Sequence, residues 1–415
     1  MLPGVLSVDR HGCQGSIIFV CPAPGDRHGS TGKECGQFIA ALLGKGIITP
    51  ALATTLRASS HFRRFDVGNP YAFASTTPRS NAILTVAWQS ICMGRLNGLD
   101  GLRGIAAVCV VVFHTAAINS TFQPFGGGYL AVDFFFLLSG YVMARSYEGG
   151  PIRKPSFLLR RVARLWPTMA IGALLGVAAH WGEPRLLSFV VAGTFLMPLF
   201  MTDQAFPINN ASWSIFFELL ANAAHSLVLS RIRSWALSLL ILAFLFCAVW
   251  IVYVFGGLKP GPYTQAFWLG LPRAMFSYSI GILLFRKWRD VPPVSIPFVV
   301  TIALLPVMLT KPLAFFLEGG WFDIAFVVLI CPTLIAGGLR HTTAWGRWLG
   351  EISFPLYATH YPILTIAHAA GASPLIGFSA TVFVAAIVQW WRPMLHYCNG
   401  KRLAALAMML RSNPT

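Results

Sequence analysis

The sequence predicts an all-α fold, a bundle of helices that crosses a membrane about ten times. Hydrophobic residues make up 56% of the 415 residues, and charged residues make up only 11%, whereas soluble domains contain about 25% charged residues. Several apolar runs are long enough to cross a bilayer, which takes about 20 residues per helix. Inside hydrocarbon the backbone must satisfy its own hydrogen bonds, and these runs are therefore expected to be helical.

The chain divides into three parts by composition. Residues 1–92 contain no sustained apolar run, and we predict a poorly organised N-terminal extension there, either disordered or upstream of the true start at Met93. A transmembrane domain is predicted over 93–395 and a cytoplasmic C-terminal tail over 396–415. The predicted apolar spans are 102–119, 128–146, 167–182, 186–201, 212–230, 235–255, 263–285, 294–310, 320–339, 349–370 and 374–391.

The positive charge of the chain follows its membrane topology. The net charge is +17, and Lys and Arg lie mostly between the apolar runs, as expected for cytoplasmic links; we therefore expect no nucleic-acid partner. All basic links between helices can be cytoplasmic only if 167–201 makes one net crossing. This predicts that 186–201 is re-entrant or interfacial, or that 167–201 is otherwise an incomplete pair of crossings. The result is ten crossings of the inner membrane with both termini in the cytoplasm.

A basic amphipathic segment precedes the third apolar run. Between Pro151 and Pro167 the spacing of apolar and basic residues predicts a helix on the cytoplasmic surface. Arg160, Arg161 and Arg164 would face the lipid headgroups. They either anchor this helix by the positive-inside rule or bind an anionic donor.

Two ionisable residues of the first span, Arg103 and His114, are predicted to share one helix face. They are eleven positions apart, which brings them nearly into register and separates them by about 16 Å along the axis. Singly, the arginine would snorkel to the interface and the histidine would make a packing hydrogen bond. Together they predict a channel wall with an anion site at the cytoplasmic end and a titratable group toward the outside.

Among the other ionisable residues inside predicted spans, four are candidates for a site: Asp133, Glu218, Arg273 and His360. Charged groups are costly in hydrocarbon and usually face the bundle interior. A histidine beside a carboxylate is the arrangement of a general base with an orienting partner, and Asp133 or Glu218 would supply that carboxylate. The alternative is a buried polar network that only fixes helix packing. Arg273 needs a partner such as a carboxylate, phosphate or carbonyl.

Four stretches together resemble the acyltransferase-3 family of membrane acyltransferases. The first carries the Arg, ten residues, His pattern, and the second resembles the family's Gly-x-x-Gly-Val-Asp-x-Phe-Phe-x-Leu-Ser-Gly-Phe, with Ala131 in place of a frequent Gly. The fourth resembles Trp-Ser-x-x-x-Glu. The stretches are Leu99 to His114, Gly128 to Tyr141, Phe157 to Pro167 and Asn210 to Glu218, with a weaker likeness at Leu349 to His360.

The resemblance implies an O-acyltransferase that moves an acyl group, often acetyl, from cytoplasmic acyl-coenzyme A to a glycan hydroxyl. It implies that Arg103 engages the donor and that His114 serves the chemistry, either as a base or as a transient acyl carrier. Acyl-coenzyme A would be a co-substrate, with no tightly bound cofactor and no metal. The thioester oxyanion needs hydrogen-bond donors, for which the candidates are Ser139, Trp213, Ser214 and Tyr357.

Two other classes of membrane protein are also consistent with the sequence. A transporter or flippase would also place ionisable groups near the midplane and use broken helices, although the two halves show no internal repeat. A structural or sensory membrane protein would tolerate loss of the buried charges. Release of free coenzyme A thiol in the presence of an acceptor distinguishes the acyltransferase from both.

Overall fold

The computed structural model describes residues 96–148, 154–311, 320–341 and 344–391. Apart from one bridge between Gln204 and Tyr263, the regular structure of these residues is helical. The all-α fold predicted from the sequence is therefore confirmed. The predicted extension at 1–92 and the predicted tail at 396–415 lie outside the described residues.

Each predicted apolar run has a helical counterpart, and several runs are built from two or three consecutive helical segments. In order these are α4 Asn97–Ile118, η1 Gly128–Leu130, α5 Ala131–Tyr147, α6 Lys154–Ala179, α7 Leu186–Phe195, α8 Ser212–Ala224, η2 His225–Leu229, α9 Ser234–Phe255, η3 Thr264–Leu269, α10 Gly270–Trp288, α11 Phe298–Leu309, α12 Trp321–Ala325, η5 Phe326–Ile330, α13 Cys331–Leu339, α14 Ala344–Ala369 and a last helix Pro374–Trp391.

Six helices of the described part are long and apolar enough to cross a membrane, which identifies the chain as a multi-pass membrane protein. Two others, α7 and α11, have 10 and 12 residues. At 1.5 Å per residue they measure about 15 and 18 Å, less than the roughly 30 Å hydrocarbon core. The count of ten crossings therefore stays a prediction. The six spans are Asn97–Ile118, Arg161–Ala179, Ser234–Phe255, Thr264–Trp288, Trp321–Leu339 and Pro374–Trp391.

The predicted surface helix and the third apolar run form one continuous helix, α6. Pro167 lies inside it, and the predicted helix boundary at this residue is wrong. Proline removes one backbone hydrogen bond, but membrane helices tolerate it when neighbouring groups satisfy the backbone. As a result, Arg161 and Arg164 lie on the same rigid element as the apolar segment that follows them.

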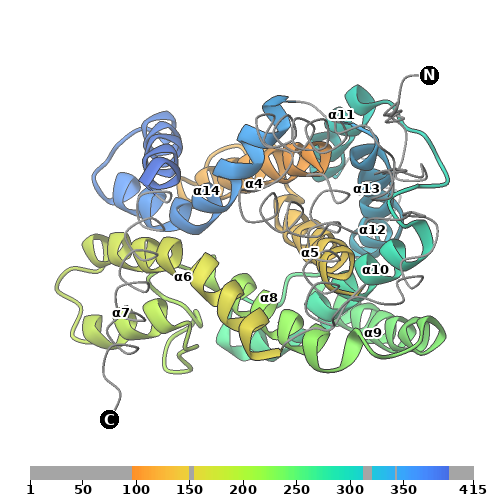
Figure 1. Cartoon of the computed structure of the whole chain (residues 1–415). Helices are drawn as coiled ribbons and strands as arrows, with labels where there is room; N and C mark the ends of the chain where they lie inside the picture. Colours follow the sequence, from red (N-terminus) through yellow and green to blue (C-terminus); the bar gives the residue numbers. More distant parts are fainter. Residues whose placement is uncertain (1–95, 149–153, 312–319, 342–343, 392–415) are drawn as a thin grey trace, which may run out of the picture. The chain divides into compact units, whose positions relative to one another are not determined.

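Two helix pairs form the centre of the fold: α4 packs along α14, and α5 packs along α10 (Figure 1). The second pair is closely spaced because glycines face carbonyl groups across it. A side chain at Gly140 would meet the carbonyl of Tyr278, and one at Gly281 would meet the carbonyl of Leu137. Small residues at such interfaces let membrane helices approach closely.

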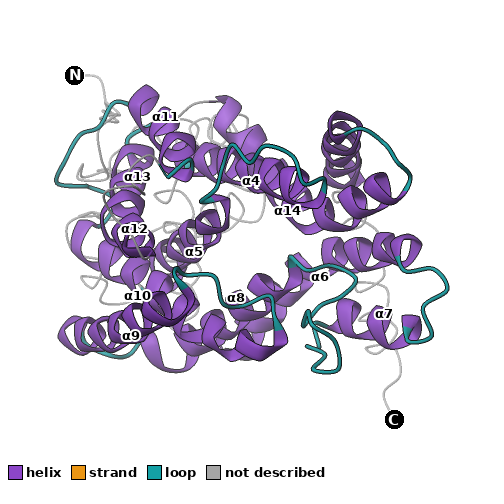
Figure 2. Cartoon of the chain, turned by 180° about the vertical axis from the view of Figure 1, so that it is seen from behind, coloured by secondary structure: helices purple, strands orange, loops and turns teal. Residues whose placement is uncertain are grey.

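Helix α9 lies beside α10 (Figure 2). Leu242, Phe246 and Tyr253 on this helix are exposed in the isolated chain. Lipid tails are as apolar as these side chains, so their exposure is expected within a bilayer. In contrast, most of α10 is buried, and α10 is therefore an interior helix of the bundle.

Contacts between the segments that link the helices define two ends of the bundle. At the first, which we call the basic end, Arg145 pairs with Asp290 at 2.5 Å and Gly98 N donates to the carbonyl of His341 at 3.0 Å. At the opposite end, Gly127 N donates to the carbonyl of Leu309 at 2.8 Å. The basic end comprises Gly98, Arg145, Glu148, Arg286, Asp290 and His341; the opposite end comprises Gly127, Leu258, Leu309, Lys311 and Asp323.

Candidate active site

Arg103 and His114 both meet α14, as their spacing on α4 predicts. Arg103 donates from Nε to Ser353 Oγ at 2.8 Å and from its terminal nitrogen to the Gly350 carbonyl. Farther along α4, the His114 ring lies 5.1 Å from the His360 ring, centroid to centroid, with the planes tilted by 38°. The interface of α4 and α14 therefore joins a cation near the basic end to a pair of imidazoles deeper in the bundle.

His360 is fully buried, and its ring is oriented by the backbone of its own helix. Its Nδ1 lies 2.6 Å from the carbonyl oxygen of Tyr357. A carbonyl can only accept a hydrogen bond, which assigns the hydrogen to Nδ1 and leaves Nε2 as a lone-pair acceptor. Within the described residues, Nε2 has no hydrogen-bond partner.

Hydroxyl groups from two helices lie next to this histidine. Ser214 Oγ on α8 and the Tyr357 hydroxyl on α14 are 2.6 Å apart, and the Tyr357 ring lies 5.6 Å from the His360 ring. The structure thus brings together three of the site residues predicted from the sequence: Ser214, Tyr357 and His360. Tyr361, which the sequence analysis missed, meets His114 edge-on at 5.6 Å; its position directly after His360 was the available signal.

Asp133 forms an ion pair with Arg273 and not a hydrogen bond with a histidine. Arg273 donates from Nε to Oδ1 at 3.1 Å and from NH2 to Oδ2 at 2.6 Å, and both side chains are almost completely buried. The guanidinium also donates to the carbonyls of Tyr129 and Pro260. A buried guanidinium needs such compensation, because an uncompensated charge in the interior is strongly destabilising.

Two further predicted residues lie in this neighbourhood. The Trp213 ring lies 5.3 Å from the guanidinium carbon of Arg273, a cation–π contact. Glu218 accepts a hydrogen bond from Ser139 at 3.0 Å. Neither Asp133 nor Glu218 is hydrogen-bonded to His114 in the part of the chain that the structure describes. The predicted carboxylate–imidazole pair is therefore not formed in this structure, and the ring beside His114 belongs to His360.

The predicted donor-binding arginines gather near the basic end. Arg164 on α6 interacts electrostatically with Arg161, Arg103 and Glu218, and Arg161 lies 2.8 Å from the sulfur of Met143. Arg103 on α4 and Arg161 and Arg164 on α6 are far apart in the sequence, but their positive charges therefore lie in the same region of the structure. The side chain of Arg160 lies outside the described residues.

A separate polar cluster at the opposite end also escaped the sequence analysis. The Tyr129 hydroxyl lies 2.6 Å from Asp323 Oδ2 and 2.6 Å from Lys311 Nζ. Asp323 Oδ2 additionally accepts from the backbone N–H of Leu258 at 2.8 Å. This cluster ties three links together, and it is joined to the Asp133–Arg273 pair through Tyr129, whose carbonyl accepts a hydrogen bond from Arg273.

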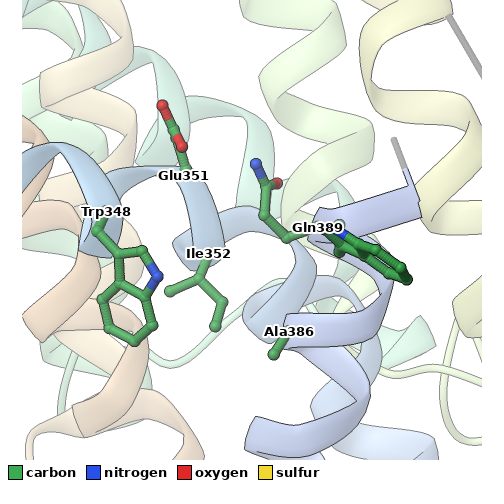
Figure 3. A pocket seen from close by; sticks show the side chains of 6 residues that line it. Trp348, Glu351, Ile352, Ala386 and Gln389 are labelled. Atoms are coloured by element: carbon green, nitrogen blue, oxygen red, sulfur yellow. The ribbon is translucent and has the colours of Figure 1, made fainter. Parts of the chain in front are cut away.

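The structure also contains a cavity of about 290 Å³ between α14 and the last helix (Figure 3). None of the predicted site residues lines it. Its α14 residues lie on the face opposite Gly350 and Ser353, the partners of Arg103, because a residue advances about 100° around a helix. The cavity is lined by Trp348, Glu351, Ile352, Ala386, Gln389 and Trp390. Among the described residues, no cluster of histidine, cysteine and carboxylate side chains suits a metal ion.

Comparison with known proteins places the chain in an enzyme class. The model of the acyltransferase-3 family, described as an acyltransferase domain, matches residues 96–391, which covers more than half of the chain. The chain belongs to this family, and it is an O-acyltransferase. The family resemblance predicted from the four motifs is confirmed, and the transporter alternative is not favoured.

Three curated relatives illustrate the similarity. “Putative membrane-bound transacylase BcsY” of Komagataeibacter xylinus is 26% identical over 66% of this chain and 74% of its own length. “Protein 2 in picA locus” of Rhizobium radiobacter is 34% identical over 31% of this chain and 79% of its own. A “Putative O-acetyltransferase” of Staphylococcus aureus (strain COL) is 24% identical over 66% of this chain, and the match spans only 52% of that protein. No solved structure matches the chain.

Proposed function

We propose that this enzyme transfers an acyl group, most simply acetyl, from acyl-coenzyme A to a hydroxyl of a surface or exported glycan. The donor would approach from the cytoplasmic side of the inner membrane. The observation that carries the proposal is the placement of Arg103 and His114 along one face of α4 against α14. The membership of the chain in an acyltransferase family and the relatives named transacylase and O-acetyltransferase support it.

The basic end suits the donor by its charge. Coenzyme A is strongly anionic, and phosphate groups form short charge-assisted hydrogen bonds with guanidinium groups. Arg103, Arg161 and Arg164 act on one region there. About 16 Å of α4 separates Arg103 from His114, a distance suited to the long, thin thioester arm.

In the proposed reaction His114 acts as the general base. It accepts the proton of the acceptor hydroxyl, whose oxygen attacks the thioester carbonyl carbon. The carbon–sulfur bond then breaks, the sulfur takes the proton from protonated His114, and coenzyme A leaves as the free thiol. The hydroxyls of Ser214 and Tyr357, which are 2.6 Å apart, are the proposed source of a donor to the transient oxyanion. The Ser214 hydroxyl donates to the Ala211 carbonyl at 3.0 Å in this structure and would have to turn away from it to free a hydrogen.

The proposed topology has ten crossings with both termini in the cytoplasm, and α7 is its re-entrant segment. Trp166 Nε1 on α6 donates to the Thr194 carbonyl at the end of α7, at 3.0 Å, and the Phe189 ring meets His180. The chain then reaches the opposite end, where Ala205 N donates to the Pro262 carbonyl at 3.0 Å. These contacts support a segment that enters the bundle beside α6 and returns.

The proposal is tested by expressing the full chain and a His114→Ala variant in a host that lacks such an enzyme. Mass spectrometry of purified surface glycans is the readout, together with thiol release from acetyl-coenzyme A by the purified enzyme. We expect an acyl mass increment and thiol release with the wild type and neither with the variant at equal abundance. Normal transfer by His114→Ala would overturn the assignment of His114, and absence of thiol release by the wild type with any glycan acceptor would overturn the donor.

A further inference from the structure

The imidazole of His114 has a histidine neighbour where a carboxylate was expected. In many hydrolases an aspartate accepts a hydrogen bond from the base and holds it in the productive tautomer. Here Asp133 is occupied by Arg273, and Glu218 accepts from Ser139. The nearest ring partners of His114 from α14 are His360 and Tyr361.

His360 is prepared to accept a hydrogen bond in a fixed direction. The Nδ1–H group of His360 donates a hydrogen bond to the Tyr357 carbonyl at 2.6 Å. The lone pair of the ring is therefore on Nε2. This nitrogen belongs to a side chain with no exposed surface and makes no hydrogen bond within the described residues. A buried acceptor left unsatisfied is destabilising, and a donor close by would remove that cost.

The distance between the two rings suits such a donor. Ring nitrogens lie about 1 Å from the ring centre, and an N–H···N hydrogen bond spans about 3 Å. Two imidazoles joined by one such bond therefore have centroids about 5 Å apart, and the observed separation of His114 and His360 is 5.1 Å. The bond itself is not formed in this structure, since His360 Nε2 has no partner among the described residues, and forming it requires the His114 ring to turn so that one of its N–H groups points at Nε2.

We propose that His360 is the positioning residue of the His114 base, through a hydrogen bond from His114 N–H to His360 Nε2. This inference rests on the proposed function. The bond places the His114 hydrogen on the nitrogen that faces His360 and leaves the other nitrogen free to take the proton of the acceptor hydroxyl. When that proton arrives, the imidazolium of His114 is stabilised by the Nε2 lone pair, and the proton later leaves with the thiol sulfur. His360 keeps its own Nδ1 hydrogen throughout.

Two substitutions separate this role from simple packing. In His360→Gln, the side-chain amide can present an acceptor oxygen at the position of Nε2, but the donor to the Tyr357 carbonyl is lost. In His360→Asn, the amide N–H can still reach that carbonyl, but nothing accepts from His114. A packing role predicts that activity follows stability, with Asn at least as active as Gln, whereas the positioning role predicts the reverse order.

The measurement uses the purified full chain with acetyl-coenzyme A and a panel of neutral oligosaccharides, following thiol release and acetylated product. We expect His360→Asn to lower kcat at least about 30-fold with little change in KM, and His360→Gln to stay within about 5-fold of wild type. His180→Gln, a histidine on α6 whose ring bonds to the Gly176 carbonyl, is the matched control and should leave kcat unchanged.

Each possible result of these measurements either supports or contradicts the positioning role of His360. Equal kcat for the Asn and Gln variants at equal thermal stability, or Asn above Gln, would overturn it while leaving the acyltransferase intact. A wild-type enzyme that releases no thiol with any acceptor would overturn the proposed function, and the positioning role falls with it. Nitrogen-15 NMR of labelled histidines gives a readout independent of turnover: the Nδ1–H form of His360 is expected, and an Nε2–H form would contradict the proposal.

Discussion

At the scale of single residues, the buried Asp133–Arg273 pair is the clearest case of a charge whose role depends on its partner. The carboxylate satisfies the guanidinium at two points, and Trp213 lies against the guanidinium. This arrangement gives Asp133 a structural task. A catalytic task for the same carboxylate requires that the pair open, and removing both charges together tests between these roles.

We expect Asp133→Asn to lower the free energy of unfolding by about 3–5 kcal/mol, because it leaves the Arg273 charge buried without a counter-charge. The double substitution Asp133→Leu with Arg273→Met removes both charges and should recover a large part of that loss. Thermal unfolding in detergent measures both effects. A double variant that is stable but inactive in acyl transfer would show that the pair serves the reaction in addition to the stability of the fold.

At the scale of helices, the close approach of α5 and α10 depends on two glycines. Gly281→Leu would drive a side chain into the Leu137 carbonyl, and the two helices would have to separate. Overpacking of this kind costs about 1–3 kcal/mol or more, and the Asp133–Arg273 pair spans the same two helices. We expect a large fall in thermal stability, measured in detergent, and loss of acyl transfer.

Leu242→Ala on α9 is the control for this prediction, since Leu242 is exposed in the isolated chain and is expected to face lipid in the membrane. It should leave the unfolding temperature nearly unchanged. If both variants unfold alike, the α5–α10 contact is not specific, and the bundle tolerates spreading at this position.

At the scale of the whole molecule, the proposed topology predicts which links a membrane-impermeant maleimide reaches. In a chain whose native cysteines are replaced by alanine, we expect Ser120→Cys and Met201→Cys to label in intact cells. We expect Ser230→Cys and Val291→Cys to label only after the membrane is opened. Met201 is informative because it follows α7; if it were shielded while Ser230→Cys labelled, α7 would be a full crossing and the single net crossing of 167–201 would be wrong.

The sequence by itself was sufficient to locate the helices and the family. Hydrocarbon leaves an apolar segment no alternative to helix, and each apolar run accordingly has a helical counterpart. Helical spacing alone also placed Arg103 and His114 on one face, since it depends only on the residues between them. The exception was Pro167, because whether a proline ends a membrane helix depends on what surrounds it.

Only the tertiary structure decided which buried groups meet. Asp133 and Arg273 are 140 positions apart, and the spacing within one helix carries no information about the face that another helix presents to it. The same holds for His114 and His360, whose rings meet because α4 packs along α14. Partner choice in the bundle follows from packing and from the cost of an uncompensated buried charge, and both are properties of the assembled helices.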